Sequence, residues 1–199
     1  SSAASDVYKR QGLNLDEAGV QTDSKGFIIT KDNFQTSAEN IFAIGDCKLG
    51  PMLAHKASEE GTALAEIIVG QVGHVNFDTI PSVVYTAPEV ASVGKTEEEL
   101  KSLGLKYKVG KFPFTANAKA KVMHETLGFV KILSDANSDK VLGVHMIGPD
   151  VGNMIAELAL AMEFGASSED IARTCHAHPT LTESIKEAAL NVEKRAIHI

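Results

Sequence analysis

The order of the predicted elements after residue 81 constrains the fold most. The strand-like segments follow one another at 82–86, 89–93, 107–114, 128–133 and 140–147. The helical segments come mainly after them, at 151–162, 167–173 and 182–193. A run of strands followed by a run of helices is typical of an α+β domain, in which helices pack on an antiparallel sheet. The sequence therefore predicts such a domain after a linker at 70–81.

Local signals support several of these boundaries. Thr96 and Glu99 have the spacing of a capping box, which predicts a short helix that Gly104 can end. The turn-forming residues 135–139 lie between two strand-like segments and predict a hairpin. Gly165 can end the helix that starts near residue 151.

Residues 12–75 show a different pattern. A short strand is predicted at 26–30, and the apolar run 40–44 is typical of a buried strand. Gly45 and Asp46 close that run, and a helix is predicted from Pro51 to about Gly70. This order would place Asp46 near a helix N-terminus, where a carboxylate suits the hydroxyls of a nucleotide-like cofactor. The alternative is that Asp46 is only a turn residue.

Composition excludes several classes of protein. The formal net charge of −7 disfavours non-specific binding to nucleic acid, and no apolar run approaches the about 20 residues that span a membrane. The two cysteines, Cys47 and Cys175, are too few for a disulfide scaffold and favour a reducing, cytosol-like compartment. Residues 1–11 are small and polar and then basic, and we interpret them as a foreign leader, with a frayed terminus as the alternative.

The clearest chemistry lies in residues 175–183. The imidazole of His178 titrates near neutral pH, so it can accept and return a thiol proton, and the Glu183 carboxylate can orient it. Thr180 and Glu183 also have capping-box spacing, so Glu183 could be purely structural. His176 and His178 could form a metal pair, but no second pair with ligand spacing is near, and we expect no metal. Cys175 could be a nucleophile or a small buried residue.

Three motifs together resemble the pyridine nucleotide-disulfide oxidoreductases, and within that family the enzymes that oxidise dihydrolipoamide. The motifs are Ile-Phe-Ala-Ile-Gly-Asp-Cys at 41–47, Pro-Met-Leu-Ala-His-Lys-Ala at 51–57, and His-Ala-His-Pro-Thr at 176–180. Residues 85–94 and 194–199 also fit that family. The resemblance extends from about Gly12 to the C-terminus and omits residues 1–11.

The resemblance implies cofactors, partners and residue roles. FAD would bind with Asp46 on its ribityl chain and with residues of the next motif along the flavin, namely Met52, Leu53, Ala54 and His55. Such enzymes are homodimers, and His178, held by Glu183, would act on the partner subunit's flavin and redox disulfide. NAD would be the electron acceptor, and the lipoyl domains and core of 2-oxo acid dehydrogenase complexes would be partners. The enzyme would be cytoplasmic in a bacterium, which we prefer, or in the mitochondrial matrix.

The expected first half of such an enzyme is not found in this sequence. The Gly-x-Gly-x-x-Gly loops for FAD and NAD and the Cys-x-x-x-x-Cys redox pair are missing. The resemblance therefore implies that 12–75 is the end of an FAD-binding α/β domain and 76–199 an interface domain. We expect the chain alone to be inactive and to retain little FAD. The alternatives are a glutathione-reductase-like or mercuric-reductase-like enzyme and a non-catalytic dimerisation module.

Overall fold

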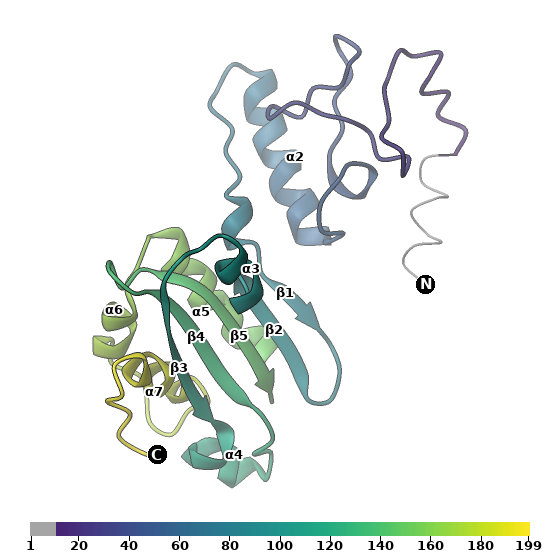
Figure 1. Ribbon diagram of the computed structural model, residues 1–199. Coiled ribbons are helices and arrows are strands. Elements are labelled where there is room, and N and C mark those ends of the chain that lie inside the picture. The colour runs from purple at the N-terminus through teal and green to yellow at the C-terminus, as the bar shows by residue number, and fades with distance from the viewer. Residues whose placement is uncertain (1–10) are drawn as a thin grey trace. The chain divides into compact units, whose positions relative to one another are not determined.

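The computed structural model describes residues 11–199 and divides between Val75 and Asn76 into two units (Figure 1). The predicted foreign leader 1–11 lies outside the described residues except for its last residue, Gln11.

A five-stranded antiparallel sheet is the centre of residues 76–199. The strands are β1 (Ser82–Val84), β2 (Glu89–Gly94), β3 (Tyr107–Pro113), β4 (Phe129–Asp135) and β5 (Val141–Gly148). They lie in the order β1-β2-β5-β4-β3, and every neighbouring pair is antiparallel. The predicted hairpin is β4–β5, whose turn is held by Asp135 Oδ1, the acceptor for the backbone N–H groups of Asn137 and Ser138. The α+β prediction is therefore confirmed.

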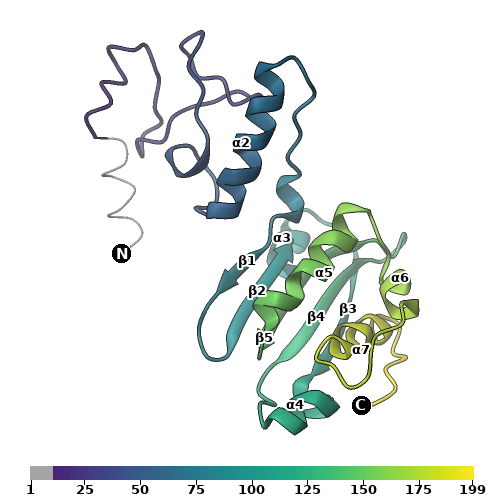
Figure 2. The same cartoon turned by 180° about the vertical axis from the view of Figure 1, so that it is seen from behind.

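Helices α5 (Val151–Glu163) and α7 (Glu183–Val192) cover the same face of this sheet (Figure 2). Their apolar side chains meet those of the sheet in one core, represented by Ile132 of β4, Leu158 of α5 and Ile185 of α7, all fully buried. Helix α6 (Ser168–Arg173) packs on α7. The helix predicted after Thr96 is α3 (Glu97–Ser102), and both hydrogen bonds of its capping box form.

Helix α7 approaches β3 at Gly110. A Cβ atom at this position would lie 2.0 Å from the backbone oxygen of Ala188 and 2.6 Å from the backbone nitrogen of Val192. No side chain fits between the two backbones. Gly110 therefore sets the distance between the sheet and the helix that begins with Glu183.

The 310 turn η3 (Phe114–Ala116) and helix α4 (Ala118–Met123) were not predicted from the sequence. Asn117 caps α4 through its side-chain oxygen, which accepts the Ala120 N–H at 2.9 Å. The six-residue helix is too short to show an apolar repeat, so only its cap could have indicated it.

In the 11–75 part of the chain, the predicted helix is α2 (Ala54–Ile68), which starts three residues after Pro51. The two predicted strands were wrong. Ile28 forms only isolated bridges with Thr22 and Lys48, and the apolar run 40–44 forms one bridge, through Phe42. Each segment has a neighbour over only a few residues, 21–23 beside 27–29 and 34–36 beside 41–43, which is too short a pairing to form a strand. Residues 45–47 instead form the 310 turn η1 (Gly45–Cys47).

The unit of residues 76–199 begins with the 310 turn η2 (Phe77–Thr79).

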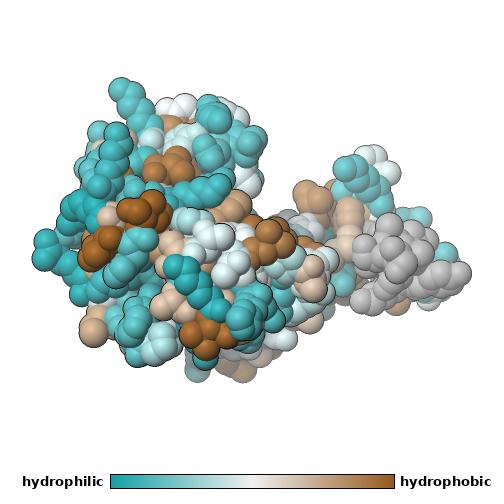
Figure 3. Space-filling view, turned by 90° about the horizontal axis from the view of Figure 1, so that it is seen from below, coloured by the Kyte–Doolittle hydropathy of each residue, from teal (hydrophilic) through white to brown (hydrophobic). Residues whose placement is uncertain are grey.

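Seen from below, polar residues dominate the surface, and apolar residues lie in separate small groups (Figure 3). Across residues 11–199, helices of the length and apolar character needed to cross a bilayer were not found.

Candidate functional site

His178 lies on the irregular segment 174–182 that connects α6 to α7. The His178–Pro179 peptide bond is cis. After Pro179, Leu181 enters the main apolar core with 9% of its surface exposed. The Thr180 hydroxyl donates to the backbone oxygen of Ala177 at 2.7 Å, which closes the turn around His178. The segment is thus fixed on its C-terminal side and carries His178 outward.

The structure brings His178 and Glu183 together as a hydrogen-bonded pair. Nδ1 of His178 lies 2.9 Å from Oε1 of Glu183, and the two side chains are 70% and 24% exposed. The ionised carboxylate can only accept, so Nδ1 carries the proton in this contact. The neutral imidazole then has its lone pair on Nε2, and the His178 side chain is open to an incoming reactant.

Glu183 also has the structural role that the sequence left open. Its Oε2 accepts the Thr180 backbone N–H at 2.9 Å, which is one half of a capping box. The rest of a capping box is not present, because the N-cap position of α7 is Thr182 and the Thr180 hydroxyl donates to Ala177. One carboxylate therefore both starts α7 and orients His178.

The environment keeps Glu183 ionised. Partial burial acts to raise the pKa of Glu183, but hydrogen bonds from the Thr180 N–H and from His178 lower it, as do the charges of His178 and His198. The net result is a pKa below the usual value for a glutamate. The group that orients His178 is thus negatively charged throughout the neutral range.

Asn117 connects α4 to the start of α7. Its Nδ2 donates to the backbone oxygen of Thr180 at 3.0 Å and to the hydroxyl of Ser184 at 2.9 Å, and the residue is 3% exposed. Asn117 thus supports both sides of the turn that holds His178 and Glu183. The sequence reasoning missed it, although an Asn before a helix-forming run is a recognisable N-cap signal.

A small pocket of about 60 Å³ lies beside the pair. It is lined by His178, Glu183, Phe112, Ala116, Asn117, Ala118, Glu187 and His198. Glu187, one helical turn after Glu183, is buried and accepts Nδ1–H of His198 at 2.7 Å and the Ile197 N–H at 2.8 Å. It therefore binds the last residues of the chain next to the site, a contact the sequence reasoning did not anticipate.

The sequence left two alternatives open, a metal pair formed by His176 and His178 and a nucleophilic or buried role for Cys175. Nε2 of His176 lies 2.8 Å from Oε1 of Glu157, while Nδ1 of His178 contacts Glu183, so the two imidazoles face different carboxylates. A group of three potential metal ligands is not found among residues 11–199. Cys175 is exposed and carries a free thiol, so it is not a buried packing residue.

In the other unit, Asp46 lies in η1, which packs against α2. The turn is clamped at Gly45, whose N–H donates to Oε2 of Glu60 at 2.6 Å and whose carbonyl accepts Nζ of Lys56 at 3.3 Å. Lys56 and Glu60 are 1% and 0% exposed, and their charged atoms are 3.5 Å apart. Lys48 adds a second cation, 2.9 Å from Oε1 of Glu60. This buried ionic cluster determines where the Asp46 turn sits on α2.

The four other residues predicted to bind a cofactor lie at the start of α2. Leu53 is the N-cap, and its side chain forms no capping hydrogen bond. Met52 before it and Ala54 and His55 after it are exposed, with Met52 at 38%. The first turn of α2, whose backbone N–H groups carry partial positive charge, follows the Asp46 turn in the chain.

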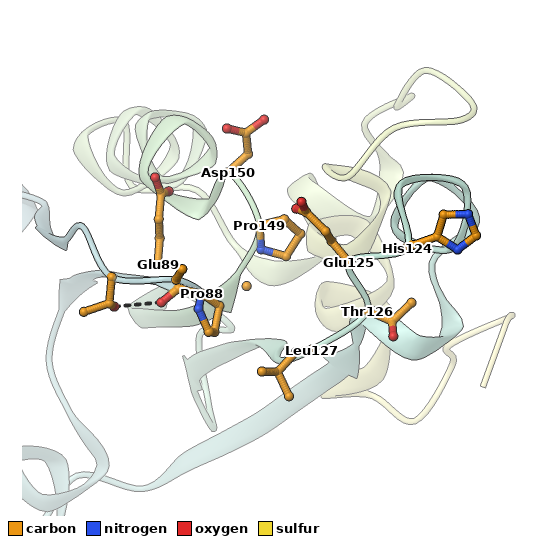
Figure 4. Close-up of a pocket in the computed structure, with 11 residues that line it drawn as sticks. Pro88, Glu89, His124, Glu125, Thr126, Leu127, Pro149 and Asp150 are labelled. Atoms are coloured by element: carbon orange, nitrogen blue, oxygen red, sulfur yellow. Dashed lines mark hydrogen bonds between the residues drawn. The ribbon is translucent and has the colours of Figure 1, made fainter.

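A larger pocket of about 540 Å³ lies in the unit of residues 76–199 (Figure 4). It has no lining residue in common with the small pocket beside His178. Figure 4 shows Glu89, Glu125 and Asp150 around it, with Pro149 between the last two. The carboxylate of Glu89 accepts the Gly152 N–H at 2.8 Å and so supports the start of α5. This pocket contains no residue that the sequence predicted as functional.

Comparison with known families decides the identity of the fold. The dimerisation domain of the pyridine nucleotide-disulphide oxidoreductases matches residues 80–189, which is more than half of the chain. The chain belongs to this family. A second family description, pyridine nucleotide-disulphide oxidoreductase, matches residues 8–61. The family resemblance inferred from the three motifs is therefore confirmed.

Individual relatives within the oxidoreductase family are closely similar. The chain is 55% identical over 188 residues to a mitochondrial dihydrolipoyl dehydrogenase of Pisum sativum, covering 94% of this chain and 38% of that protein. It is 53% identical to dihydrolipoyl dehydrogenase 3 of Pseudomonas putida, covering 95% of this chain and 40% of that protein. The chain thus spans about two fifths of the length of these relatives.

Solved structures of the oxidoreductase family have the same fold. LpdA of Mycobacterium tuberculosis matches with a TM-score of 0.83 at 28% identity, covering 90% of this chain and 39% of that one. The HOCl-induced flavoprotein disulfide reductase RclA of Escherichia coli matches with a TM-score of 0.78 at 26% identity, covering 87% and 40%.

Proposed function

We propose that this chain is the C-terminal part of a dihydrolipoyl dehydrogenase, the FAD enzyme that reoxidises dihydrolipoamide with NAD as acceptor. The observation that carries the proposal is the His178–Glu183 pair, with a 2.9 Å hydrogen bond and an exposed imidazole. It occurs in a chain that is 55% identical to a dihydrolipoyl dehydrogenase. His178 and Glu183 are the proposed catalytic pair.

In the proposed mechanism, His178 takes the proton from a thiol of dihydrolipoamide on its Nε2. The thiolate, rather than the thiol, attacks a disulfide, so this proton transfer activates the substrate. Glu183 holds the proton on Nδ1 and stabilises the imidazolium that forms. Its bond to the Thr180 N–H fixes the carboxylate, so the ring is oriented before the substrate arrives.

Residues of the 11–75 unit fit the FAD of such an enzyme. The Asp46 turn is held on α2 by Lys56 and Glu60, and Asp46 lies close in the chain to the start of that helix. Asp46 would accept a hydrogen bond from the ribityl hydroxyls, and a further set of residues would line the flavin, namely Met52, Leu53, Ala54 and His55. When bound, FAD supplies the redox chemistry between the disulfide and NAD. The N-terminal end of α2 carries partial positive charge, which would favour negative charge beside it.

The proposal extends to partners and location. Two copies would pair through residues 76–199, and each His178 would serve the partner subunit's flavin and disulfide. The family description of residues 80–189 as a dimerisation domain supports this pairing. The lipoyl domains of 2-oxo acid dehydrogenase complexes would deliver the substrate. Relatives occur in mitochondria and in a bacterium, and we place this protein in the bacterial cytoplasm.

A chimera tests the proposed activity. This chain would replace the matching segment of the Pisum sativum enzyme, with which it is 55% identical over 188 residues. We expect NAD-dependent oxidation of dihydrolipoamide and no comparable reduction of glutathione disulfide with NADPH. A folded, flavin-loaded chimera with the opposite preference would replace the proposal with the glutathione-reductase-like alternative.

The chain by itself can be examined as a dimerisation module. We expect it to sediment as a dimer, to retain little flavin absorbance and to lack lipoamide-dependent NADH turnover. Turnover by the purified chain would contradict the assignment of the flavin and disulfide chemistry to other parts of the enzyme.

A further inference from the structure

The proton-transfer mechanism does not use His176, although it is the more deeply placed of the two neighbouring histidines. Its side chain is 5% exposed, whereas that of His178 is 70% exposed. The other residues of the segment 174–178 are exposed. His176 is therefore the inward anchor of an otherwise exposed stretch that carries His178.

Both ring nitrogens of His176 face hydrogen-bond acceptors. Nδ1 lies 3.0 Å from the backbone oxygen of Thr174, and Nε2 lies 2.8 Å from Oε1 of Glu157 on α5. A carbonyl oxygen and a carboxylate cannot donate, and a neutral imidazole has only one N–H. The two contacts are satisfied together when both nitrogens are protonated, so the geometry fits an imidazolium.

The charged groups around this ring come from two helices. Glu157 of α5 raises the pKa of His176 through its hydrogen bond, and the Thr174 carbonyl raises it further. Burial and the ammonium group of Lys186 on α7, which donates to the same Thr174 oxygen at 3.0 Å, act in the opposite direction. The net result is a pKa above the usual value for a histidine.

We propose that His176 is a positioning residue, which as an imidazolium ties the segment carrying His178 to α5 through Glu157. This inference rests on the proposed function, because it concerns the placement of the proposed proton acceptor. The anchor acts on the N-terminal side of His178, whereas Glu183 and Asn117 act on the C-terminal side. The segment is then held at both ends, with the His178 ring between them.

The anchor depends on pH in a defined direction. Because the pKa of His176 is raised in the folded chain, the stabilisation is fully present below the unfolded value of about 6.5. It is lost as pH rises through the folded pKa. Loss of one proton leaves a ring nitrogen lone pair facing an acceptor, which weakens the connection to α5 or to Thr174.

NMR on this chain with 15N-labelled histidine tests the proposal directly. Over a pH series, we expect both nitrogens of His176 to keep the shifts of protonated nitrogen to a higher pH than those of a free imidazole. Glu157→Gln keeps an acceptor of the same shape and removes the charge, so it should move the His176 transition to lower pH. A His176 transition in the wild type at or below that of a free imidazole, near about 6.5, would overturn the proposal.

The effect on His178 separates positioning from simple stabilisation. In His176→Gln, the neutral His178 ring should lose its preference for protonation on Nδ1, and the Thr180 N–H should exchange with solvent several times faster. His124→Asn is the matched control, because His124 is an exposed histidine at the end of α4 in a left-handed conformation that Asn tolerates. An unchanged His178 tautomer and unchanged Thr180 exchange in a folded His176→Gln chain would refute the positioning role.

If His176→Gln does not fold, the wild-type pH series and Glu157→Gln test the positioning role of His176 in its place. Raising the pH through the His176 transition should accelerate Thr180 exchange beyond its intrinsic pH dependence, and an absence of this step would refute the role. These readouts need no turnover, so they can fail while the proposed dehydrogenase activity stands, and the chimera can fail while they hold.

Discussion

Glu183 Oε1 lies 2.9 Å from His178 Nδ1, and the other oxygen of the same carboxylate accepts a backbone N–H at the start of α7. The side chain that orients the imidazole is therefore fixed by the fold. The two roles that the sequence offered as alternatives for Glu183 are thus both present as contacts. A substitution can therefore change the contact to His178 and keep the hydrogen bond at the start of α7, so the two roles of Glu183 can be tested separately.

Two substitutions at Glu183 distinguish its roles. Glu183→Gln retains an oxygen for the Thr180 N–H, so at neutral pH it should destabilise the chain less than Glu183→Ala does. Glu183→Ala removes both contacts and should cost about 0.5–2 kcal/mol, as other losses of a helix N-terminal cap do. In the chimera both variants should lower kcat for dihydrolipoamide, because Gln can present its NH2 group to Nδ1 and favour the wrong tautomer. Equal stabilities of the two variants would contradict the helix-start role.

The lowered pKa of Glu183 predicts a pH dependence of stability. A carboxyl whose pKa is depressed by folding stabilises the native state above its unfolded value, near 4.5, and that contribution disappears as pH falls through the folded value. The unfolding free energy of the wild type relative to Glu183→Gln should therefore be highest at pH 6–7 and shrink below about pH 4.5. Urea titrations of both proteins between pH 3 and 7 measure this, and a difference independent of pH would argue against an ionised, hydrogen-bonded Glu183.

Gly110→Ala should disturb the packing of α7, the helix that begins with Glu183, on β3. The new Cβ would meet the backbone oxygen of Ala188 at 2.0 Å, so the helix has to move away from β3. Overpacking of this kind costs about 1–3 kcal/mol. Gly61→Ala is the control. Gly61 lies inside α2, where Ala is favoured over Gly, and the new Cβ would lie 3.6 Å from the side chain of Ile44, which is an ordinary contact. Thermal unfolding should show destabilisation only for Gly110→Ala.

The buried cluster under the Asp46 turn predicts a large loss of stability. Glu60→Gln leaves Lys56 buried at 1% exposure with its neutralising charge removed, and breaking such a pair costs about 3–5 kcal/mol. Glu59→Gln, on the exposed side of the same helix, should change little. Hydrogen exchange of the Gly45 N–H, which donates to Glu60, reads the effect at the turn itself. Unchanged protection in Glu60→Gln would show that the cluster does not hold the turn.

The features that could be predicted from sequence are those encoded locally. The capping box at Thr96 and Glu99 and the hairpin turn starting at Asp135 depend on residues within a few positions of each other, and both were found as expected. His178 and Glu183 are also close in sequence, so their pairing could be anticipated. In each of these correct predictions, the residues that interact are close together in the sequence.

The contacts that could not be predicted join distant parts of the chain. Asn117 reaches Ser184 across 67 positions, and His176 reaches Glu157 across 19. No periodic pattern marks either pair. The strand predicted at 40–44 was wrong for a related reason, because an apolar run indicates burial but does not determine over how many residues a neighbouring segment pairs with it.

Action across the subunit interface can be tested by complementation. A His178→Gln chimera would be co-expressed with a chimera in which both cysteines of the family's Cys-x-x-x-x-Cys pair are serine. Each homodimer should be inactive, while the heterodimer should combine one intact His178 with the partner's intact disulfide and regain turnover. A purified, flavin-loaded heterodimer with no turnover would indicate that His178 acts within its own subunit.

The most direct test of the central claim is kcat/KM for dihydrolipoamide in the chimera with and without His178→Gln. General acid–base catalysis by one side chain contributes about 10²–10⁴-fold, so we predict a loss in that range with unchanged flavin absorbance and oligomeric state. The exposed His74, in the other unit, provides the control His74→Gln, which should retain wild-type activity. A His178→Gln chimera that keeps kcat/KM within about twofold of the wild type, far below the expected contribution, would contradict the assignment of His178 as the proton acceptor.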